Sequence, residues 1–245
     1  ENGTKFAVMY SGGIDSTVIM VALLKNLTET ELKNITICCS ADSIIENPSF
    51  YKNYIQGKFT ILDSNLHKYD DLYEMGYKII TADEGDCIFG TLFGLTMYTN
   101  FDYYLEGMSE ESKNNLKKYK HRISDETVHY SVFKDMIIKH LGLPEDKEFG
   151  RILYDKYDHN VKTSTVPVHS LHDFFWWLIF NVKYLNCSVR GALYFNDRVP
   201  YRTMIDNVVN WYNDSEYQLW SMNNKNNGKK IQRTMGSYKN IARDY

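Results

Sequence analysis

The segment at residues 11–17 reads SGGIDST and joins a short apolar run to a longer one. Gly12 and Gly13 lack a Cβ, so the backbone here can turn sharply and bring its N–H groups close to an oxyanion. The N-terminus of a following helix would add partial positive charge at the same point. Three side-chain hydroxyls can donate hydrogen bonds to one phosphate, and they belong to Ser11, Ser16 and Thr17. This segment, the first motif, therefore predicts a phosphate-binding loop.

Asp15 places a negative charge inside the first motif, so it cannot bind phosphate directly. A magnesium ion that bridges the Asp15 carboxylate to phosphate oxygens removes the conflict. The motif also lacks the lysine of the GxxxxGK[ST] phosphate loop, and it is shorter. We therefore expect phosphate and Mg²⁺ to be bound by a loop of a different kind.

The pattern SGGxDS in the first motif resembles the signature of the PP-loop ATP pyrophosphatases. The resemblance implies an enzyme that cleaves ATP between the α and β phosphates and adenylates a substrate oxygen. It also implies that the departing pyrophosphate is held in this loop. The alternative interpretation is a tight strand-to-helix turn in which Asp15 caps the helix.

Residues 79–90 form a second motif, IITADEGDCIFG, which resembles the LSGEGADELFG stretch of asparagine synthetases and β-lactam synthetases. Thr81 and Ala82 fall where that family has Ser and Gly, and Asp83 falls on its Glu. The resemblance places Thr81 and Ala82 at the nucleotide. It gives Asp83 the role of general base toward an incoming amine.

Asp86 falls on the family's Asp and, like Asp15, comes just after a predicted strand. The carboxyl ends of parallel strands meet at one crevice, so both carboxylates can face one Mg²⁺ on the triphosphate. Two departures from the family, Glu84 for a glycine and Cys87 for a glutamate, favour a protein that binds nucleotide without turnover. A plain acidic loop that faces water is a further alternative.

Weaker matches to the asparagine synthetases follow in the second half of the chain. The stretch RVPY from Arg198 resembles their RVPF, and the stretch KKIQR from Lys229 resembles their KxILR. These matches imply that Arg198 and Lys229 are catalytic cations, with Lys230 as the alternative to Lys229. Cys39, at the end of the second predicted strand, would hold adenine through its backbone, by position in the family.

Elements of regular structure must position these residues. Four apolar runs read as buried strands, at residues 5–10, 35–39, 58–62 and 77–81. Because helix-like runs lie between them, the pattern predicts an α/β fold with a parallel sheet and helices on both faces. After about residue 100 the strand pattern stops, and helices are expected near 126–141 and 170–183. We expect an α/β nucleotide-binding part at 1–105 and a mainly helical extension at 106–245, together in one structural unit.

The bulk composition narrows the class of protein. The chain has 245 residues and a net charge of −3 at pH 7, so no overall basic field favours nucleic acid or a membrane surface. Its cysteines show no zinc spacing and favour a reduced, cytoplasmic setting. The longest apolar run, at 174–180, is too short to span a bilayer and predicts a helical core or a dimer face.

Together these observations predict an ATP- and Mg²⁺-dependent, AMP-forming ligase of asparagine-synthetase type, which joins a carboxylate to an amine. No glutaminase domain with an N-terminal catalytic cysteine is visible in the sequence. The amine is therefore expected to be free, to come from a separate partner chain, or to belong to the substrate. One alternative is a PP-loop enzyme that adenylates a nucleobase or a tRNA oxygen. The other is a nucleotide-binding protein without turnover.

Overall fold

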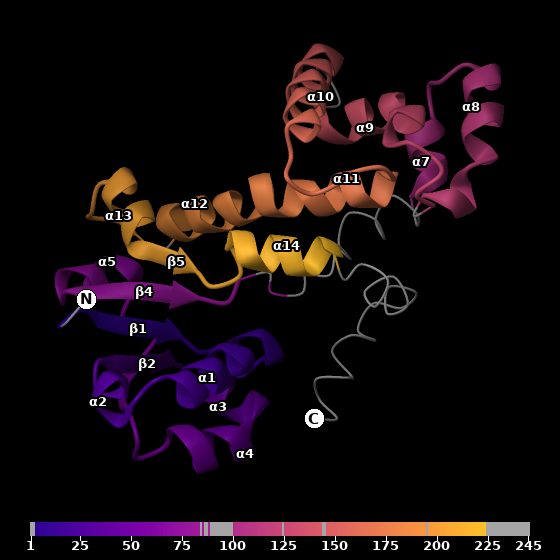
Figure 1. Ribbon diagram of the computed structural model, residues 1–245. Helices are drawn as coiled ribbons and strands as arrows, with labels where there is room; N and C mark the ends of the chain where they lie inside the picture. The colour runs from indigo at the N-terminus through magenta and orange to yellow at the C-terminus, as the bar shows by residue number, and fades with distance from the viewer. Residues whose placement is uncertain are drawn as a thin grey trace. The chain divides into compact units, whose positions relative to one another are not determined.

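The structure is a computed structural model, and Figure 1 shows its course. It describes residues 3–83, 85, 88, 100–123, 125–143, 146–194 and 196–223. Within these ranges the chain forms two compact units. The sheet unit contains the described residues up to Gly85 and those from Val182 to Asp214. The helical unit contains the described residues from 88 to 181 and from 215 to 223.

A five-stranded sheet, parallel throughout, forms the centre of the sheet unit, with the strand order β3-β2-β1-β4-β5. In the central pairs, Val8 of β1 lies opposite Ile37 of β2 and Ile80 of β4. The strand β2, ITICC, is buried at every position, as expected for a central parallel strand covered on both faces. The strands are β1 (Lys5–Met9), β2 (Ile35–Cys39), β3 (Thr60–Asp63), β4 (Tyr77–Thr81) and β5 (Val208–Asn210).

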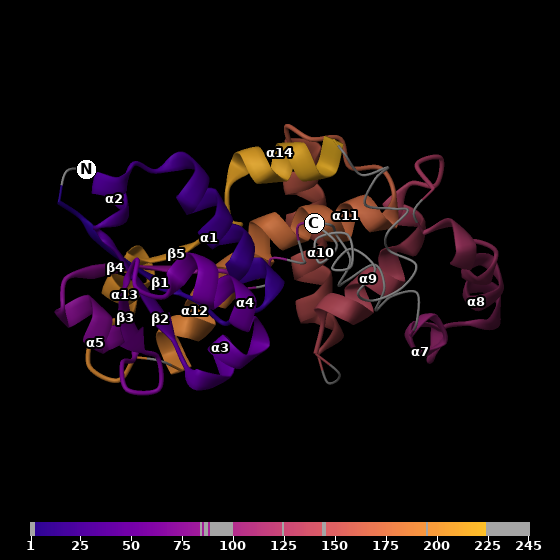
Figure 2. The ribbon, with the colours of Figure 1, turned by 90° about the horizontal axis from the view of Figure 1, so that it is seen from below.

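Helices cover both faces of this sheet, and Figure 2 shows α1 and α5 on opposite sides of the strands. Val8 belongs to a core cluster that includes Ile19 of α1, whereas Ala7 belongs to a second cluster with Leu72 of α5. The predicted α/β fold with a covered parallel sheet is therefore confirmed. The helical segments of this unit are α1 (Ile14–Asn26), α2 (Glu29–Leu32), α3 (Ala41–Glu46), α4 (Pro48–Phe50), η1 (Tyr51–Ile55), α5 (Tyr69–Glu74), α12 (Tyr184–Tyr194) and α13 (Tyr201–Asn207).

The strand β5 contradicts the expectation that strands stop near residue 100. It pairs with β4 in parallel, with Val208 opposite Ile79 and Asn210 opposite Thr81. Three residues, VVN, are too few to give a periodic signal, so only the neighbouring strand makes them a strand. The compact units consequently differ from the division expected at residue 105, because residues 182–214 belong with the sheet.

The helical unit is built around aromatic side chains of α11 (Leu171–Leu178), with Phe174, Phe175 and Trp176 all nearly fully buried. The indole N–H of Trp176 lies 2.7 Å from the hydroxyl oxygen of Ser221, which satisfies it inside this core. Residues 174–180 are all buried, which confirms the expected helical core. The other segments include α7 (Phe101–Leu105), α8 (Glu110–Lys117), η3 (Lys120–Arg122), η4 (Tyr130–Phe133), α9 (Lys134–Leu141), α10 (Lys147–Lys162), η5 (Ile179–Lys183), which runs on into the sheet unit, and α14 (Ser215–Asn223).

Candidate functional site

A cavity of about 620 Å³ opens at the carboxyl ends of the strands in the sheet unit. This is the edge of a parallel sheet at which ligands bind in open α/β folds. The ends of β1 and β2, the turn after β4 and the loop between β3 and α5 all contribute to its wall. Six residues that the sequence singled out line it, namely Ser11, Gly13, Asp15, Thr81, Ala82 and Asp83. The two motifs, far apart in the sequence, thus face one cavity.

The remaining sequence-predicted residues lie elsewhere. Gly12, Ser16 and Thr17 belong to the same turn but do not line the cavity, and Cys39 ends β2 beside it. The Cys39 carbonyl already accepts a hydrogen bond of 3.1 Å from the Ser64 N–H, so it is engaged with the loop after β3. Two further predicted residues, Asp86 and Lys229, lie outside the described residues.

Gly12 adopts a left-handed backbone conformation, with φ of +80°, at the point where the chain leaves β1. A Cβ at this position would lie only 2.1 Å from the carbonyl oxygen of Ser43. Both the dihedral angle and the close approach therefore require glycine. Gly13 then caps α1 with an extended backbone and no side-chain cap, which leaves the first turn of the helix open to an anion.

The hydroxyls of the first motif brace its own turn. The buried Ser16 hydroxyl donates to the Gly13 carbonyl at 3.0 Å and accepts from the Ser11 N–H at 3.2 Å. The Thr17 hydroxyl donates to the same Gly13 carbonyl at 2.9 Å. Because a hydroxyl has one hydrogen, this arrangement uses Ser16 and Thr17 to shape the turn. Their direct donation to phosphate stays a prediction.

Gly85 of the second motif packs directly against Asp15 of the first. A Cβ on Gly85 would lie 2.9 Å from both Cβ and Cγ of Asp15, and 2.5 Å from Cε2 of Tyr212. Only a residue without a side chain fits between these two groups. Asp86 lies outside the described residues, so the predicted pairing of Asp15 with Asp86 on one metal ion stays a prediction.

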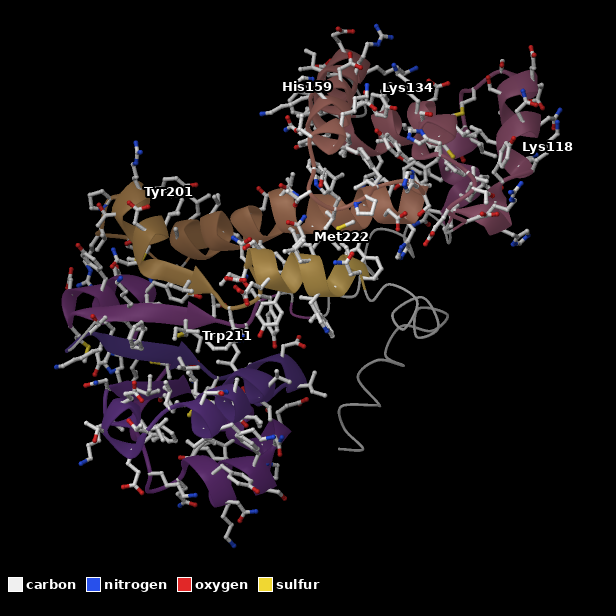
Figure 3. The ribbon with its side chains drawn as sticks, in the orientation of Figure 1. Lys118, Lys134, His159, Tyr201, Trp211 and Met222 are labelled. Carbon is white, nitrogen blue, oxygen red and sulfur yellow. The ribbon has the colours of Figure 1, made fainter. Side chains whose placement is uncertain are left out.

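The residues at and after β5 connect the two motifs by hydrogen bonds. None of these residues was predicted from the sequence to belong to the site. The Tyr212 hydroxyl donates to the Asp15 carbonyl at 2.8 Å, and the Asn210 amide donates to the Asp83 carbonyl at 3.1 Å. The Trp211 N–H donates to the Thr81 carbonyl at 3.0 Å, and Figure 3 shows Trp211 beside the ends of β1 and β4. No pattern in the sequence signals these contacts, because each depends on where β5 joins the sheet.

Tyr69 is a further cavity residue that the sequence analysis missed. Its ring is 5% exposed and packs on Gly191 of α12, where a Cβ would lie 3.0 Å from Cε2 of the tyrosine. Burial raises the pKa of Tyr69, and the nearby Asp83 carboxylate raises it further. The phenol therefore stays protonated at neutral pH, and it makes a hydrogen bond with the side chain of Thr81 at the same wall.

The thiols at the end of β2 are not nucleophiles. Burial raises the pKa of Cys38 to about 12, and the neighbouring Cys39 adds to the shift. Burial also raises the pKa of Cys39, helped by the Asp63 carboxylate. Both groups are therefore protonated at neutral pH, and a protonated thiol is a poor nucleophile.

Arg198, expected to be a catalytic cation, does not line the cavity. Its guanidinium bonds Asp70 at 3.1 Å, contacts Asp71 and lies 3.5 Å from Glu74, all on α5. Burial alone raises the pKa of the Asp70 carboxyl, but hydrogen bonds from Arg198 and two backbone N–H groups outweigh it and leave that pKa below its ordinary value. Through these ion pairs, Arg198 connects the segment before α13 to α5.

Backbone groups that suit an anion and a carboxylate that suits a cation lie side by side in this cavity. The glycine turn and the open first turn of α1 suit an anion, and the Asp15 carboxylate lies beside them as an oxygen ligand. Among the described residues, no group of three or more His, Cys, Asp and Glu side chains is placed to hold a metal ion by itself. A metal here would depend on phosphate oxygens for the rest of its ligands.

Comparisons of the chain with known proteins found no match. No protein-family model, no curated protein and no solved structure matches the chain. Within the described ranges, moreover, no helix has both the length and the apolar character needed to cross a bilayer. The two motifs and the cavity that they share are therefore the features of this chain that bear on its function.

Proposed function

We propose that the chain is a PP-loop ATP pyrophosphatase that works as an AMP-forming amide synthetase of asparagine-synthetase type. One observation carries the proposal. Ser11, Gly13 and Asp15 of the SGGIDST turn and the residues Thr81–Asp83 line a single cavity at the carboxyl edge of a parallel sheet. Both stretches resemble the same family, and that resemblance requires them to face one nucleotide-sized cavity.

The first half of the reaction makes an acyl-adenylate. A carboxylate oxygen of the substrate attacks the α-phosphorus of ATP, the bond from that phosphorus to the bridging oxygen breaks, and pyrophosphate leaves. The backbone N–H groups of the first turn of α1 would bind the departing pyrophosphate. Asp15, with Asp86 as predicted, would hold Mg²⁺, which supplies charge neutralisation on the leaving group.

The second half forms the amide. The amine nitrogen attacks the acyl carbon, the bond from that carbon to the AMP oxygen breaks, and one proton leaves the nitrogen. Asp83 lines the cavity and would accept that proton as a general base. Tyr69, kept protonated at the same wall, adds no second negative charge beside Asp83.

The proposal is tested by incubating the purified chain with ATP, Mg²⁺ and a panel of carboxylic acids, with ammonium ion as the amine. We expect AMP and pyrophosphate in equal amounts, dependent on the acid. Asp15→Asn should abolish them, whereas Asp42→Asn, an exposed aspartate of α3 outside the cavity, should not. Products of ADP and phosphate would contradict the proposal, and ATP binding without any product would favour the nucleotide-binding alternative.

If AMP forms only when a nucleobase or tRNA replaces the acid panel, the chemistry is right but the substrate class is wrong. A separate partner that supplies the amine would show as turnover that needs a second protein and not free ammonium ion. The source of the amine is therefore read from the same assay.

A further inference from the structure

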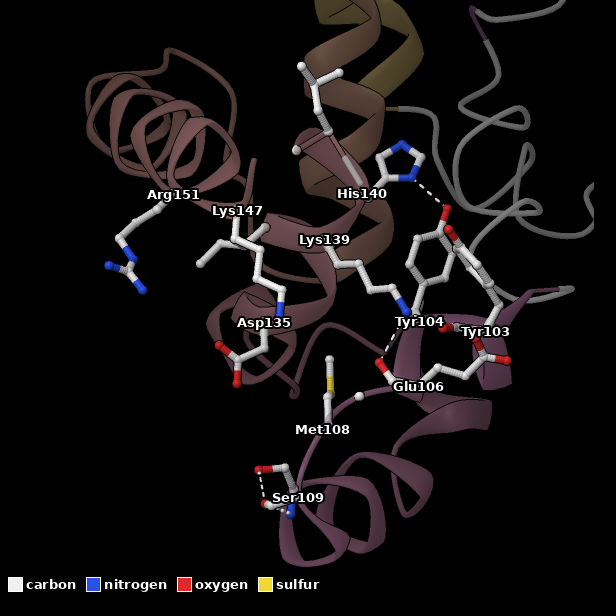
Figure 4. Close-up of a pocket in the computed structure, with 15 residues that line it drawn as sticks. Tyr103, Tyr104, Glu106, Met108, Ser109, Asp135, Lys139, His140, Lys147 and Arg151 are labelled. Carbon is white, nitrogen blue, oxygen red and sulfur yellow. Dashed lines mark hydrogen bonds between the residues drawn. The ribbon is translucent and has the colours of Figure 1, made fainter. Parts of the chain in front are cut away.

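A second cavity, of about 500 Å³, lies wholly within the helical unit and outside the site described above (Figure 4). It lies between the end of α7, the start of α8, the helix α9 and the start of α10. Its size is that of a pocket for a small molecule. Neither motif of the proposed function contributes to it.

Tight packing fixes the walls of this cavity. A Cβ on Gly150 would lie 2.3 Å from the Ile138 carbonyl oxygen and 2.9 Å from the Cα of Gly142, so α9 and α10 meet at bare backbone. Across the cavity, the Tyr104 hydroxyl lies 2.7 Å from Nδ1 of His140 and joins α7 to α9. Walls held in this way form a shaped pocket before any ligand arrives.

Two cationic side chains in the lining already have partners within the protein. The Lys139 ammonium donates to the carbonyls of Tyr103 at 2.5 Å and Glu106 at 3.2 Å, and it lies over the Tyr103 ring. The Arg151 guanidinium pairs with Glu148 at 3.2 Å. Neither side chain is free to bind a ligand without giving up these contacts.

Three other charged side chains line the cavity, and two of them are acidic and one is basic. Within the part of the chain that the structure describes, the side chains of Glu106, Asp135 and Lys147 make no hydrogen bond or ion pair. In Figure 4, Asp135 and Lys147 lie on one side of the cavity, across from Glu106 and Tyr103. A carboxylate and an ammonium thus lie on the same side of the cavity without pairing with each other.

The lining also offers apolar surface. Tyr103 and Leu143 are large side chains that remain 53% and 51% exposed at the cavity, and Met108 and Ile138 line it as well. Covering such exposed apolar groups with a ligand is favourable, by about 25 cal/mol for each Å² removed from water. The ligand should therefore carry an apolar portion beside its charges.

We propose that this cavity binds a free α-amino acid with an apolar side chain. Asp135 takes the α-ammonium group, Lys147 takes the α-carboxylate, and the side chain covers Met108 and Tyr103. A purely anionic ligand such as phosphate would meet two carboxylates, and a simple amine would meet the Lys147 ammonium. Glu106, on the opposite wall, disfavours amino acids with a second carboxylate.

Isothermal titration calorimetry of the full chain with L-alanine, L-leucine and L-phenylalanine tests this site. We expect saturable binding of at least one, and binding about tenfold weaker or worse when either charge is missing. For leucine, the probes that lack one charge are leucinamide and 4-methylpentanoate. If none of the three amino acids binds at millimolar concentration, or if a singly charged probe binds as well as leucine, the proposal is wrong.

Variants then locate the bound amino acid. Asp135→Asn and Lys147→Met should each weaken binding about tenfold. The exposed controls Glu111→Gln on α8 and Lys156→Met on α10 lie outside the cavity and should bind normally. Asp15→Asn should also bind normally. Loss of binding in Asp15→Asn alone would place the amino acid in the other cavity and overturn this assignment, while leaving the proposed function intact.

Discussion

The Tyr212 hydroxyl donates a hydrogen bond of 2.8 Å to the backbone carbonyl of Asp15. Tyr212 follows the last strand of the sheet, and Asp15 lies in the first turn of the first long helix. The same tyrosine ring packs on Gly85, which in turn touches the Asp15 side chain. The three residues fix the distance between the two motifs, so each of them is a point at which the proposed reaction can be disturbed.

Tyr212→Phe removes that hydrogen bond and keeps the ring. We expect the free energy of unfolding to fall by about 1 kcal/mol, the usual net value of one hydrogen bond. Turnover to AMP should fall by more than this loss implies, because Asp15 loses its positioning contact. Urea unfolding and AMP release measure the two effects. Tyr201→Phe, at an exposed tyrosine of α13, is the matched control, and equal behaviour of the two variants would contradict the positioning role.

Gly12→Ala and Gly13→Ala form a second matched pair. Alanine at Gly12 meets both a left-handed backbone and the Ser43 carbonyl at 2.1 Å, so we expect a loss of stability of about 3 kcal/mol. Gly13 has φ of −65°, and its Cβ would meet only the Ser11 hydroxyl oxygen at 3.3 Å. Gly13→Ala should therefore fold nearly normally. Thermal unfolding of both variants checks the difference, and similar midpoints would show that the turn is misplaced.

Asp15→Asn and Asp86→Asn test the predicted metal site. Each change keeps the shape of the side chain but halves the predicted carboxylate charge on Mg²⁺. We expect turnover to fall by orders of magnitude in either variant, and the double variant to be little worse than each single one, because the two act as one unit. Pyrophosphate release over a range of Mg²⁺ concentrations is the measurement. Near-normal turnover in Asp86→Asn would remove that residue from the site.

Arg198→Met tests whether this arginine stabilises the fold through Asp70. The Asp70 pKa is lower in the folded chain than in the unfolded chain. Its contribution to stability is therefore complete above the unfolded carboxyl pKa, about 4, and is lost as pH falls through the lower folded value. The stability gap between wild type and variant should thus be wide at pH 7 and narrower at about pH 3, measured by urea unfolding.

The control for this change is Arg202→Met, at an exposed arginine of α13. It should show no such dependence on pH. If Arg198→Met instead loses AMP formation without any change of stability, that result would contradict the structural role and favour the catalytic role expected from the RVPY resemblance.

Local sequence patterns predicted four of the five strands of the sheet. The runs at 35–39 and 77–81 match β2 and β4 at both ends, because a central parallel strand must be apolar on both faces and so leaves a continuous signal. The sequence also predicts that Asp15 and Asp86 face one crevice; the structure places Asp15 and Asp83 at one cavity, whereas Asp86 lies outside the described residues. The strands were predicted from neighbouring residues only, whereas the shared crevice follows from the general geometry of a parallel sheet, in which the carboxyl ends of the strands lie at one edge.

The contacts that the sequence did not predict all depend on distant partners. Arg198 could pair with α5 or face the cavity, and only the path of the chain before α13 decides this. Tyr69 and Tyr212 are two among 20 tyrosines, and nothing in their neighbours marks them as site residues. Resemblance to a family locates what the family shares, whereas these contacts belong to this chain's own packing.

The position of β5 at the edge of the sheet also bears on how the protein is made. A chain emerging from the ribosome can pair β1, β2, β3 and β4 long before residue 208 has been synthesised. Until then the Asp15 carbonyl lacks its tyrosine partner and Gly85 has no ring to pack against. The contacts that join the two motifs are thus among the last of this unit to form during translation, and a nascent chain released before Tyr212 would carry both motifs without them.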